Sequence, residues 1–207
     1  MARTAPTDYE REAWDRGLDR VVGVDEAGCG PLAGPVVAAA VALRPGQNLE
    51  GVYDSKALSR KQREELALEI RDRVLAFSVA AASTREIDRL NIRRATSLAM
   101  RRAVRGLPFH PELLLVDGRH MPELGEHTHI VKGDRLSLSI ACASILSKTV
   151  RDRLMVRLSS RYPAYGWDEN KGYGTGQHLA AIREHGPTPH HRCTWAPIAQ
   201  PELPLEV

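Results

Sequence analysis

The sequence predicts an α/β protein with a mixed sheet. Short apolar runs of strand length, rich in valine, alanine and leucine, alternate with longer amphipathic segments of helix length. Their order is strand, strand, helix, strand, helix, strand, strand, helix, which is typical of an α/β fold with a mixed sheet. The 207 residues contain no internal repeat and no linker long enough to separate two full domains. We therefore expect one domain.

The first half of the chain begins with two buried strands. Residues 20–28 and 34–43 are valine- and alanine-rich runs joined through a turn of glycines and prolines. A helix is expected over 59–74, because Ser59 starts a Ser-x-x-Gln capping box and the apolar residues that follow recur on one face. The run "VLAFSVAAAS", 74–83, predicts a third strand.

The second half starts with another capping box. Its Ser-x-x-Glu spacing at residue 83 predicts a helix that ends near a glycine and a proline at about residue 106. Residues 112–118 and 128–134 are short apolar runs that each end in an acid, as central strands do. Helices are expected over 136–161 and 177–185, and a proline-rich tail follows.

Composition limits the class of protein. Hydrophobic residues make up 43% of the chain and charged residues 27%, which are ordinary values for a globular protein with a core. There is no apolar run long enough for a transmembrane helix and no secretory signal, so we expect a cytoplasmic protein with no membrane partner. The three cysteines are widely spaced without a C-x-x-C, which supports neither a disulfide framework nor a thiolate zinc site. The net charge of +3 is compatible with a polyanionic partner.

Carboxylates stand at the ends of three predicted strands. In open α/β sheets, ligands bind outside the carboxyl ends of the strands, so we expect these acids to meet. Two like charges about 4 Å apart repel by roughly 4 kcal/mol at an effective dielectric of about 20, so a cluster would protonate, splay apart or bind cations. Hard oxygen ligands suit Mg²⁺ or Mn²⁺, which activate water in phosphoryl displacement. Single acids at strand ends are otherwise simply solvated. The acids are Asp25, Glu26, Asp117 and Asp134.

A glycine-rich turn follows the first two acids. Neighbouring strand residues point to opposite faces, so we expect the strand to break at Asp25 and Glu26 if both are to converge. The turn "GCGPLAG" does not fit a dinucleotide fingerprint, because its spacing differs and it leads into a strand. Either it is a tight turn that needs positive φ, or the bare amides of Gly28, Cys29 and Gly30 approach a ligand closely. Beside a carboxylate cluster we favour the second interpretation.

Eight segments, taken together, resemble the ribonuclease HII family, the bacterial type 2 ribonucleases H. They occur in the family's order and cover roughly residues 20–197. The segments are "GVDEAGCGPLAGPVV", "DSKALS", "EIDRLNI", "LLVDG", "VKGD", "SLSIACASILSKTVRD", "YPAYGWDENKGYGT" and "EHGPTPHHR".

The resemblance implies a ribonuclease H-like fold, a five-stranded mixed sheet flanked by helices with a small helical C-terminal part. It implies metal-dependent cleavage of RNA in RNA–DNA hybrids. It also implies nicking of duplex DNA on the 5′ side of a single embedded ribonucleotide, leaving 3′-hydroxyl and 5′-phosphate ends, as ribonucleotide excision repair requires. We accordingly divide the chain into a polar N-terminal extension (1–19), a catalytic domain (20–197) and a flexible tail (198–207).

Site residues follow from the same resemblance. Asp25, Glu26, Asp117 and Asp134 match the family's catalytic, metal-binding acids. Tyr173 matches a tyrosine that packs on the sugar at the ribo-to-deoxyribo junction, where the 2′-hydroxyl distinguishes RNA from DNA. The family usually has Gly-Arg-Gly in the turn, whereas this chain has Cys29, so we expect recognition through the backbone with a lower substrate affinity. Lys56, Ser144 and Lys148 resemble positions near the nucleic-acid backbone.

Other polar groups allow two interpretations each. Three arginines share one face of the helix expected over 136–161 and form either a solvated basic face or a stripe that follows phosphates. The cluster "HGPTPHHRC" superficially resembles a zinc site, but it lacks a second ligand pair and is better explained as a packed C-terminal loop. Cys29 is a poor nucleophile, since no partnered base is identifiable. The arginines are Arg153, Arg157 and Arg161, and the cluster holds His185, His190, His191 and Cys193.

The sequence thus predicts a monomeric, Mg²⁺- or Mn²⁺-dependent endoribonuclease that acts on RNA–DNA hybrids and ribonucleotide-containing duplex DNA. The alternatives are another nuclease of the same fold, such as a junction resolvase, and a non-catalytic nucleic-acid-binding module. The module would have no need of four acids that repel phosphate. Gln200, Leu203 and Leu205 in the tail faintly resemble a sliding-clamp-binding peptide, although a disordered end is the simpler interpretation.

Overall fold

The computed structural model describes residues 3–199, and within that range its centre is a five-stranded sheet. The strands are β1 (Val21–Ala27), β2 (Val36–Ala42), β3 (Ala76–Ala82), β4 (Leu113–Asp117) and β5 (Thr128–Ile130). Their order is β3-β2-β1-β4-β5. β1 pairs antiparallel with β2, and β2 with β3, whereas β1 pairs parallel with β4, and β4 with β5. The predicted α/β fold with a five-stranded mixed sheet is confirmed.

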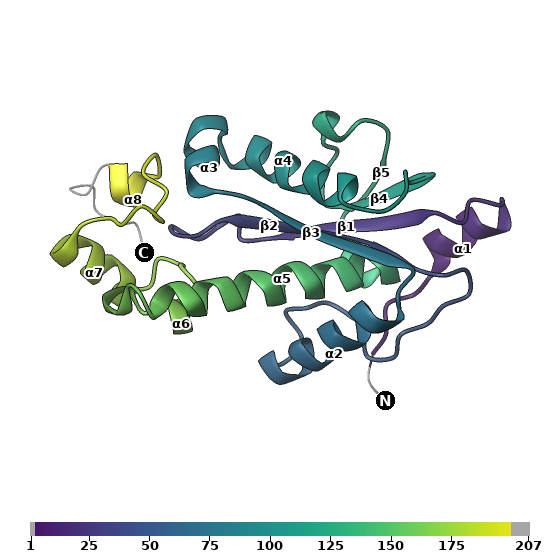
Figure 1. The fold of residues 1–207 in the computed structure, drawn as a ribbon, viewed down its shortest axis with the longest axis horizontal. Coiled ribbons are helices and arrows are strands. Elements are labelled where there is room, and N and C mark those ends of the chain that lie inside the picture. Colours follow the sequence, from purple (N-terminus) through teal and green to yellow (C-terminus); the bar gives the residue numbers. More distant parts are fainter. Residues whose placement is uncertain (1–2, 200–207) are drawn as a thin grey trace.

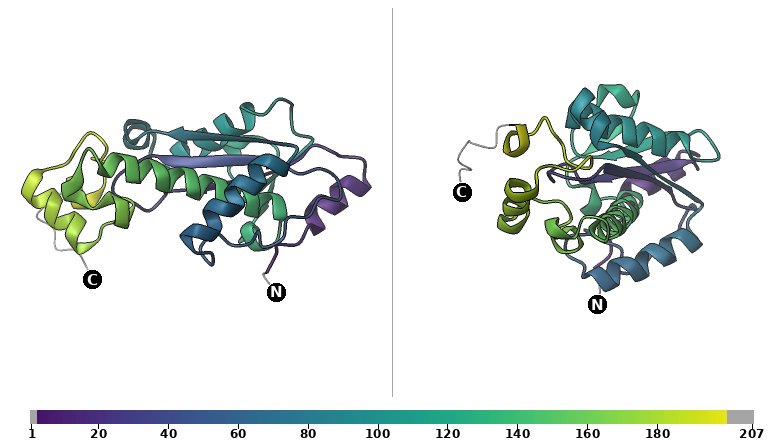
Figure 2. Two further views of the ribbon diagram at one scale, coloured as in Figure 1. Left: turned by 60° about the horizontal axis from the view of Figure 1, so that its bottom comes forward. Right: turned by 60° about the vertical axis from the view of Figure 1, so that its left-hand side comes forward.

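Helices cover both faces of this sheet (Figures 1 and 2). α4 (Ile92–Arg105) packs on one face, and α5 (Leu138–Ser159) packs on the other together with α2 (Arg60–Arg73). Because successive strand residues point to opposite faces, Val22 and Val24 of β1 face α4, whereas Val21 belongs to the core on the α5 side. The sheet therefore separates two apolar cores.

Small residues bring α5 close to the sheet. A methyl group added to Gly23 of β1 would lie 2.3 Å from the backbone nitrogen of Ile140, near the start of α5. Every residue of β2 is buried, and four of the seven are alanines. α5 therefore runs directly along β1, which brings Ser144 and Lys148 toward the carboxyl end of that strand.

The helix predicted from residue 83 to about 106 is two helices. α3 (Thr84–Leu90) and α4 are separated by Asn91, whose φ of 65° interrupts the helical backbone. The Asn91 side chain then accepts a hydrogen bond from the backbone N–H of Arg94 (3.1 Å) and caps α4. Asn tolerates a left-handed backbone better than most residues, so a capping asparagine can end one helix and start the next. Both predicted capping boxes, at Ser59 and Ser83, are present.

Two other boundaries differ from the predicted ones. β5 ends at Ile130, because Lys132 adopts a left-handed conformation (φ 60°) that a strand cannot continue through. Asp134 therefore lies in the short helix η2 (Gly133–Arg135) and not at the end of a strand. α5 ends at Ser159, so Arg161 lies in the following turn and does not extend a continuous arginine stripe.

The C-terminal part packs around a small aromatic and histidine core. Trp167 Nε1 donates a hydrogen bond to His178 Nε2 (3.0 Å), and the ring nitrogens of His178 and His191 are also 3.0 Å apart. Both histidines are buried, whereas His185 and Cys193 are exposed, so the cluster that resembled a zinc site is divided between the interior and the surface. The helical elements here are η3 (Pro163–Tyr165), α6 (Trp167–Asn170), α7 (Gly176–His185) and α8 (Ala196–Ala199). None of the helices in residues 3–199 is long and apolar enough to cross a membrane.

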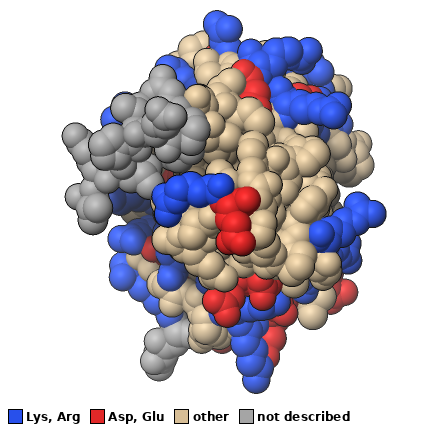
Figure 3. All heavy atoms as spheres, turned by 90° about the vertical axis from the view of Figure 1, so that its left-hand side faces the viewer, with Lys and Arg blue, Asp and Glu red and all other residues tan. Residues whose placement is uncertain are grey.

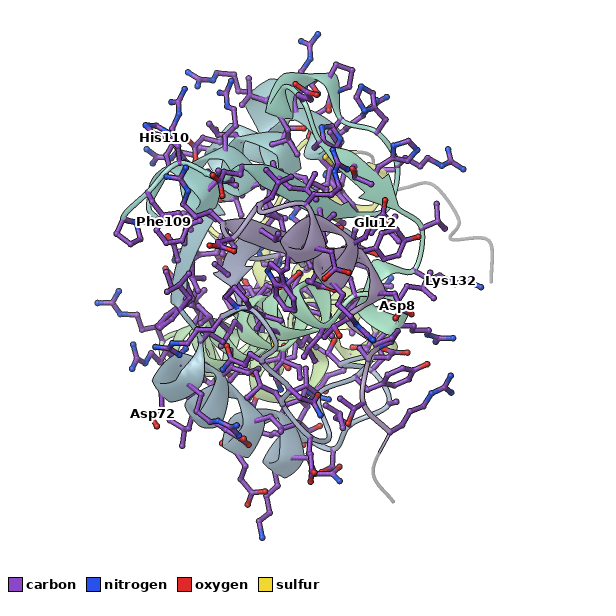
Figure 4. All side chains as sticks on the ribbon, turned by 90° about the vertical axis from the view of Figure 1, so that its right-hand side faces the viewer. Asp8, Glu12, Asp72, Phe109, His110 and Lys132 are labelled. Carbon is purple, nitrogen blue, oxygen red and sulfur yellow. The ribbon has the colours of Figure 1, made fainter. Side chains whose placement is uncertain are left out.

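The polar N-terminal stretch contains a helix that the sequence analysis did not predict. α1 (Asp8–Asp15) carries Glu10, which is fully buried at the start of α5. Glu10 Oε1 accepts hydrogen bonds from the hydroxyls of Ser137 (2.5 Å) and Ser139 (2.6 Å) and from the Ser139 amide (2.9 Å). A carboxylate at this position also interacts favourably with the dipole of α5. In Figure 4, Asp8 and Glu12 of the same helix are labelled on the outer surface of this end of the molecule.

Replacing Glu10 with alanine should destabilise the protein, because the two serine hydroxyls and the Ser139 amide would remain buried without their acceptor. We expect a loss of about 2–4 kcal/mol in the free energy of unfolding, measured by urea denaturation. The matched control is Glu12→Ala on the exposed face of α1, which should change stability by no more than about 0.5 kcal/mol. Equal effects of the two substitutions would contradict this role of Glu10.

Candidate active site

A pocket of about 530 Å³ opens at the carboxyl ends of β1 and β4. Every residue that the sequence analysis assigned to the site lines this pocket, although these residues come from six separate parts of the chain. They are Asp25, Glu26, Gly28, Cys29, Gly30, Lys56, Asp117, Asp134, Ser144, Lys148 and Tyr173, and the remaining lining residues are Ala27, Ser55, Arg63 and Arg151.

Parallel pairing places Asp25 beside Asp117. Val24 of β1 is opposite Val116 of β4 in the ladder, so the next residue of each strand is an aspartate. Asp25 is only 5% exposed, and its Oδ1 accepts a hydrogen bond from the Glu26 amide (2.7 Å). Two residues 92 positions apart in sequence are thus brought together by strand register, as the strand-end pattern predicted.

Glu26 reaches the same pocket from the other face of the sheet. β1 does not break at the two acids, since Asp25, Glu26 and Ala27 all remain paired with β2. Asp25 lies on the α5 side, near Ser144, whereas Glu26 lies on the α4 side and contacts Cys29. The pocket is open at the end of the strand and is therefore accessible to side chains from both faces. The expected break comes only after Ala27.

The turn between β5 and α5 adds Asp134. The Gly133 amide donates a hydrogen bond to Asp117 Oδ1 (2.6 Å), which fixes this turn against the end of β4. A methyl group on Gly133 would lie 2.7 Å from Ile140 Cδ1, so a larger residue here would require the Ile140 side chain to shift. The next residue, Asp134, is consequently held beside Asp117.

The four carboxyl groups affect one another electrostatically. Burial raises the pKa of Asp25 well above its usual range, and the neighbouring charges of Glu26 and Asp117 raise that pKa further. Burial likewise raises the pKa of Glu26, Asp117 and Asp134, and the charge of Asp117 adds to the effect on both Glu26 and Asp134. The acids therefore form one interacting group that positive charge would stabilise.

This group fits a hard divalent cation. Its donors are carboxylate oxygens, with no histidine among the residues that line the pocket, which is the chemistry that Mg²⁺ and Mn²⁺ prefer. In residues 3–199 the side chains of three or more His, Cys, Asp or Glu residues are nowhere close enough together to enclose an ion. The carboxylates of the pocket are thus near enough to raise one another's pKa without enclosing an ion in the described part of the chain.

Cys29 is a hydrogen-bonding group and not an ionised thiol. Its Sγ donates to Glu26 Oε1 (3.4 Å) and lies 3.4 Å from the Thr96 hydroxyl of α4. Burial raises the pKa of Cys29 to about 12, and the charge of Glu26 contributes in the same direction. A thiol that stays protonated at neutral pH is a weak nucleophile, in agreement with the sequence interpretation.

Tyr173 faces the glycine-rich turn across the pocket. Its side chain is 48% exposed, and a methyl group on Gly30 would lie 3.4 Å from the Tyr173 ring. The Tyr173 carbonyl accepts a hydrogen bond from Nδ1 of His178, which ties it to the start of α7. An exposed aromatic ring on a fixed backbone therefore lies close to the bare amides of the turn, at the edge of the pocket.

Basic and hydroxyl groups complete the pocket. Lys148 Nζ bonds Asp152 Oδ1 (2.7 Å), while Lys56 is exposed at the rim. The Ser144 hydroxyl is 3.0 Å from that of Ser55. Arg153 lies elsewhere, in a shallow depression beside α2, so the proposed arginine stripe does not enter the acid pocket. The tail residues Gln200, Leu203 and Leu205 lie outside the described residues.

Two buried arginines behind the turn were not predicted from the sequence. Arg151 is 1% exposed and Arg192 is fully buried, and each donates hydrogen bonds to backbone carbonyls of residues 28–35. Burial lowers the pKa of Arg192 to about 10, so its guanidinium still carries a charge at neutral pH. The one signal in the sequence was that both arginines fall in segments that resemble the family, Arg151 in "SLSIACASILSKTVRD" and Arg192 in "EHGPTPHHR".

Comparisons with known proteins agree with this geometry. The family model described as ribonuclease HII matches residues 22–198. The ribonuclease HII of Bordetella pertussis is 56% identical over 179 residues, which is 86% of this chain and 89% of that protein. Among solved structures, the ribonuclease H2 of Pyrococcus horikoshii OT3 superposes with a TM-score of 0.75 at 27% identity, covering 87% of this chain and 95% of that one. The ribonuclease HII in the PCNA complex from Archaeoglobus fulgidus has a TM-score of 0.70 at 27% identity, covering 85% and 95%.

The sheet order and the acid pocket define an enzyme of the ribonuclease H class, a hydrolytic nuclease with the ribonuclease H fold. Within that class, the chain belongs to the ribonuclease HII family, as its sequence motifs indicated.

Neutralising one acid should stabilise the metal-free protein. We expect Asp117→Asn to raise the thermal midpoint in EDTA by roughly 2–4 °C, equivalent to about 1 kcal/mol for a chain of this size, because it removes repulsion from the other carboxylates. Adding Mg²⁺ or Mn²⁺ should raise the midpoint of the wild type more than that of the variant. Asp72→Asn, on the exposed surface of α2 (Figure 4), is the control and should leave both values unchanged. A metal response as large in Asp117→Asn as in the wild type would exclude Asp117 as a ligand.

Proposed function

We propose that this chain is a divalent-metal-dependent endoribonuclease that hydrolyses the RNA strand of RNA–DNA hybrids and nicks duplex DNA on the 5′ side of a single embedded ribonucleotide. The products would carry 3′-hydroxyl and 5′-phosphate ends. The observation that carries the proposal is that four carboxylates, a glycine-rich turn and an exposed tyrosine line one pocket. We propose further that it acts as a monomer.

The carboxylates have the central role. Asp25, Glu26, Asp117 and Asp134 would hold Mg²⁺ or Mn²⁺. When bound, such an ion supplies Lewis-acid chemistry, which favours attack by water on the phosphodiester and stabilises the leaving oxygen. The protein contributes the positions of these acids, which are set by the register of β1 and β4 and by the hydrogen bond from Gly133 to Asp117.

Selection of a ribonucleotide would depend on the opposite side of the pocket. The amides of the turn at Gly28, Cys29 and Gly30 would approach the sugar at the junction, and the Tyr173 ring would pack on it. A 2′-hydroxyl is both a donor and an acceptor, so backbone amides can distinguish it from a deoxyribose. Lys56, Ser144 and Lys148, which lie around the same pocket, would contact the nucleic-acid backbone.

Positive charge for a duplex is present at this end of the molecule. Figure 3 shows Lys and Arg side chains at several places around the edge of the face that carries the C-terminal helices. Such charges attract a polyanion without sequence preference. The relative from Archaeoglobus fulgidus was solved in a complex with PCNA, but the tail that resembled a clamp-binding peptide lies outside the described residues, and clamp binding is not part of our proposal.

The proposal predicts a metal-dependent nick. A DNA duplex with one ribonucleotide should be cut once, on the 5′ side of that ribonucleotide, with Mg²⁺ or Mn²⁺ and not with EDTA. Asp117→Asn should lower kcat/KM at least about 100-fold, because even a group that only supports a metal ligand is commonly worth 10–100-fold. The ends can be identified by electrophoresis and phosphatase treatment. A duplex cut equally with EDTA, or cut at all-DNA sites, would refute the proposal, as would cleavage restricted to four-way junctions.

Cys29 offers a test of affinity. Cys29→Arg should lower KM on the single-ribonucleotide duplex, because a guanidinium at this rim can bond a phosphate where a neutral thiol cannot. Cys29→Ser is the matched control, since it keeps a small hydrogen-bond donor to Glu26 and should leave KM near that of the wild type. If KM is the same for arginine and cysteine, the missing guanidinium has no effect on affinity.

A further inference from the structure

Arg192 lies directly behind the glycine-rich turn. Its Nη1 donates to the Cys29 carbonyl (2.9 Å), and its Nη2 donates to the carbonyls of Gly28 (2.5 Å) and Gly34 (3.0 Å). Its Nε also bonds the Gly34 carbonyl (3.2 Å). The side chain is fully buried and does not line the acid pocket, although Gly28 and Cys29 do. One guanidinium therefore binds the turn from the side away from the pocket.

The carbonyl directions determine where the amides point. In a trans peptide the C=O and the following N–H point in opposite directions, and residues 3–199 contain no cis peptide. Because the carbonyls of Gly28 and Cys29 are directed at Arg192, the N–H groups of Cys29 and Gly30 are directed away from it. Neither amide donates to any acceptor in the described part of the chain. Two hydrogen-bond donors are thus left available on the pocket side of the turn.

The position of Arg192 is itself fixed by the turn. The Arg192 amide donates to the Leu32 carbonyl (2.9 Å), and the Gly34 amide donates to the His190 carbonyl (2.8 Å). Ala33 and His191 form an antiparallel bridge between these bonds. The guanidinium carbon also lies 4.9 Å from the centre of the Trp195 ring. Residues 190–192 therefore run alongside residues 32–34, and the side chain has little freedom to leave the turn.

A buried guanidinium among carbonyls needs an explanation. Burying a charge is costly unless other groups compensate it, and no carboxylate lies within salt-bridge distance of Arg192 in residues 3–199. Its compensation comes from the carbonyls of three peptide groups, two of which belong to Gly28 and Cys29. A cation on the carbonyl side of a peptide also polarises its N–H and makes it a stronger donor. The orientation of the Cys29 and Gly30 amides and their strength as hydrogen-bond donors thus both depend on the Arg192 side chain.

The second buried arginine holds different groups. Arg151 donates to the carbonyls of Ala33 (3.1 Å), Pro35 (3.1 Å) and Lys171 (3.0 Å), and not to those of Gly28 or Cys29. Arg151 thus ties the later part of the turn to the segment before Tyr173, whereas Arg192 alone binds the two peptide groups whose amides face the pocket.

We infer that Arg192 is a positioning residue for ribonucleotide recognition, which orients the Cys29 and Gly30 amides so that they donate to the ribose 2′-oxygen at the cleavage junction. This inference rests on the proposed function. It assigns discrimination between ribose and deoxyribose to a residue that does not touch the substrate, about 160 positions along the chain from the turn that it orients.

The test uses the full-length protein with Arg192→Lys and Arg192→Met. Binding is measured in EDTA to two duplexes of one sequence, with and without a single ribonucleotide, and KM and kcat are measured with Mg²⁺. We expect both variants to lose about tenfold or more of the preference for the ribonucleotide, mainly as a rise in KM, while affinity for the all-DNA duplex changes less than about twofold. Added guanidinium ion should restore part of the preference to Arg192→Met.

Loss of stability must be separated from loss of recognition. Ile70→Ala in the core beneath α2 is the control, since it empties a fully buried position remote from the pocket and should lower the thermal midpoint with KM unchanged. If the wild type does not nick the ribonucleotide duplex, the proposed function fails whatever Arg192 does. If the wild type nicks it and folded Arg192 variants keep the full preference, the inference is overturned.

A measurement on the wild type covers the case in which both variants fail to fold. The backbone amide resonances of Cys29 and Gly30 are followed by NMR in EDTA while each duplex is added. We expect these two amides to shift differently with the ribonucleotide duplex than with the all-DNA duplex. Identical shifts with both duplexes would overturn the inference without any substitution.

Discussion

Repulsion between carboxylates at the ends of two parallel strands is the constraint on which the rest of the molecule depends. The register of β1 and β4 places Asp25 next to Asp117, and burial prevents water from screening their charges. Left alone, such a group would protonate or move apart. The surroundings oppose the second outcome: the Glu26 amide binds Asp25, the Gly133 amide binds Asp117, and α5 packs tightly against Gly23. The fold thus holds together acids whose ionised forms a cation would stabilise.

The same principle extends to the backbone around the pocket. Two buried guanidinium groups bind the carbonyls of the glycine-rich turn, and a buried glutamate binds the start of α5. These charges come from Arg151, Arg192 and Glu10, which are remote in sequence from the groups they hold. Each of these buried side chains is hydrogen-bonded to several polar groups, which is the condition under which burying a charge is tolerated. Catalytic acids and recognition amides can then occupy one pocket without relying on loop flexibility.

Much of this could be predicted from the sequence, for a physical reason. Strand periodicity and strand-end acids depend on local pattern, so β1, β4 and the pair Asp25 and Asp117 were predictable. Where one residue's φ decided the structure, prediction failed: Asn91 splits a helix, and Lys132 ends β5 before Asp134. Glu10 and Arg192 were also missed, because charged residues suggest a surface position and their partners lie more than 120 positions away in the chain. Convergence of Asp25 and Glu26 needed no break between them, since the pocket is open to both faces of the sheet.

The central claim is that the four acids form a single cation site. Anomalous diffraction from a crystal grown with Mn²⁺, collected at the manganese edge, tests it without reference to activity. The account predicts an anomalous peak in the pocket, in direct contact with carboxylate oxygens of both Asp25 and Asp117. A well-ordered pocket with no peak, or manganese bound only at other acids on the surface, would contradict it.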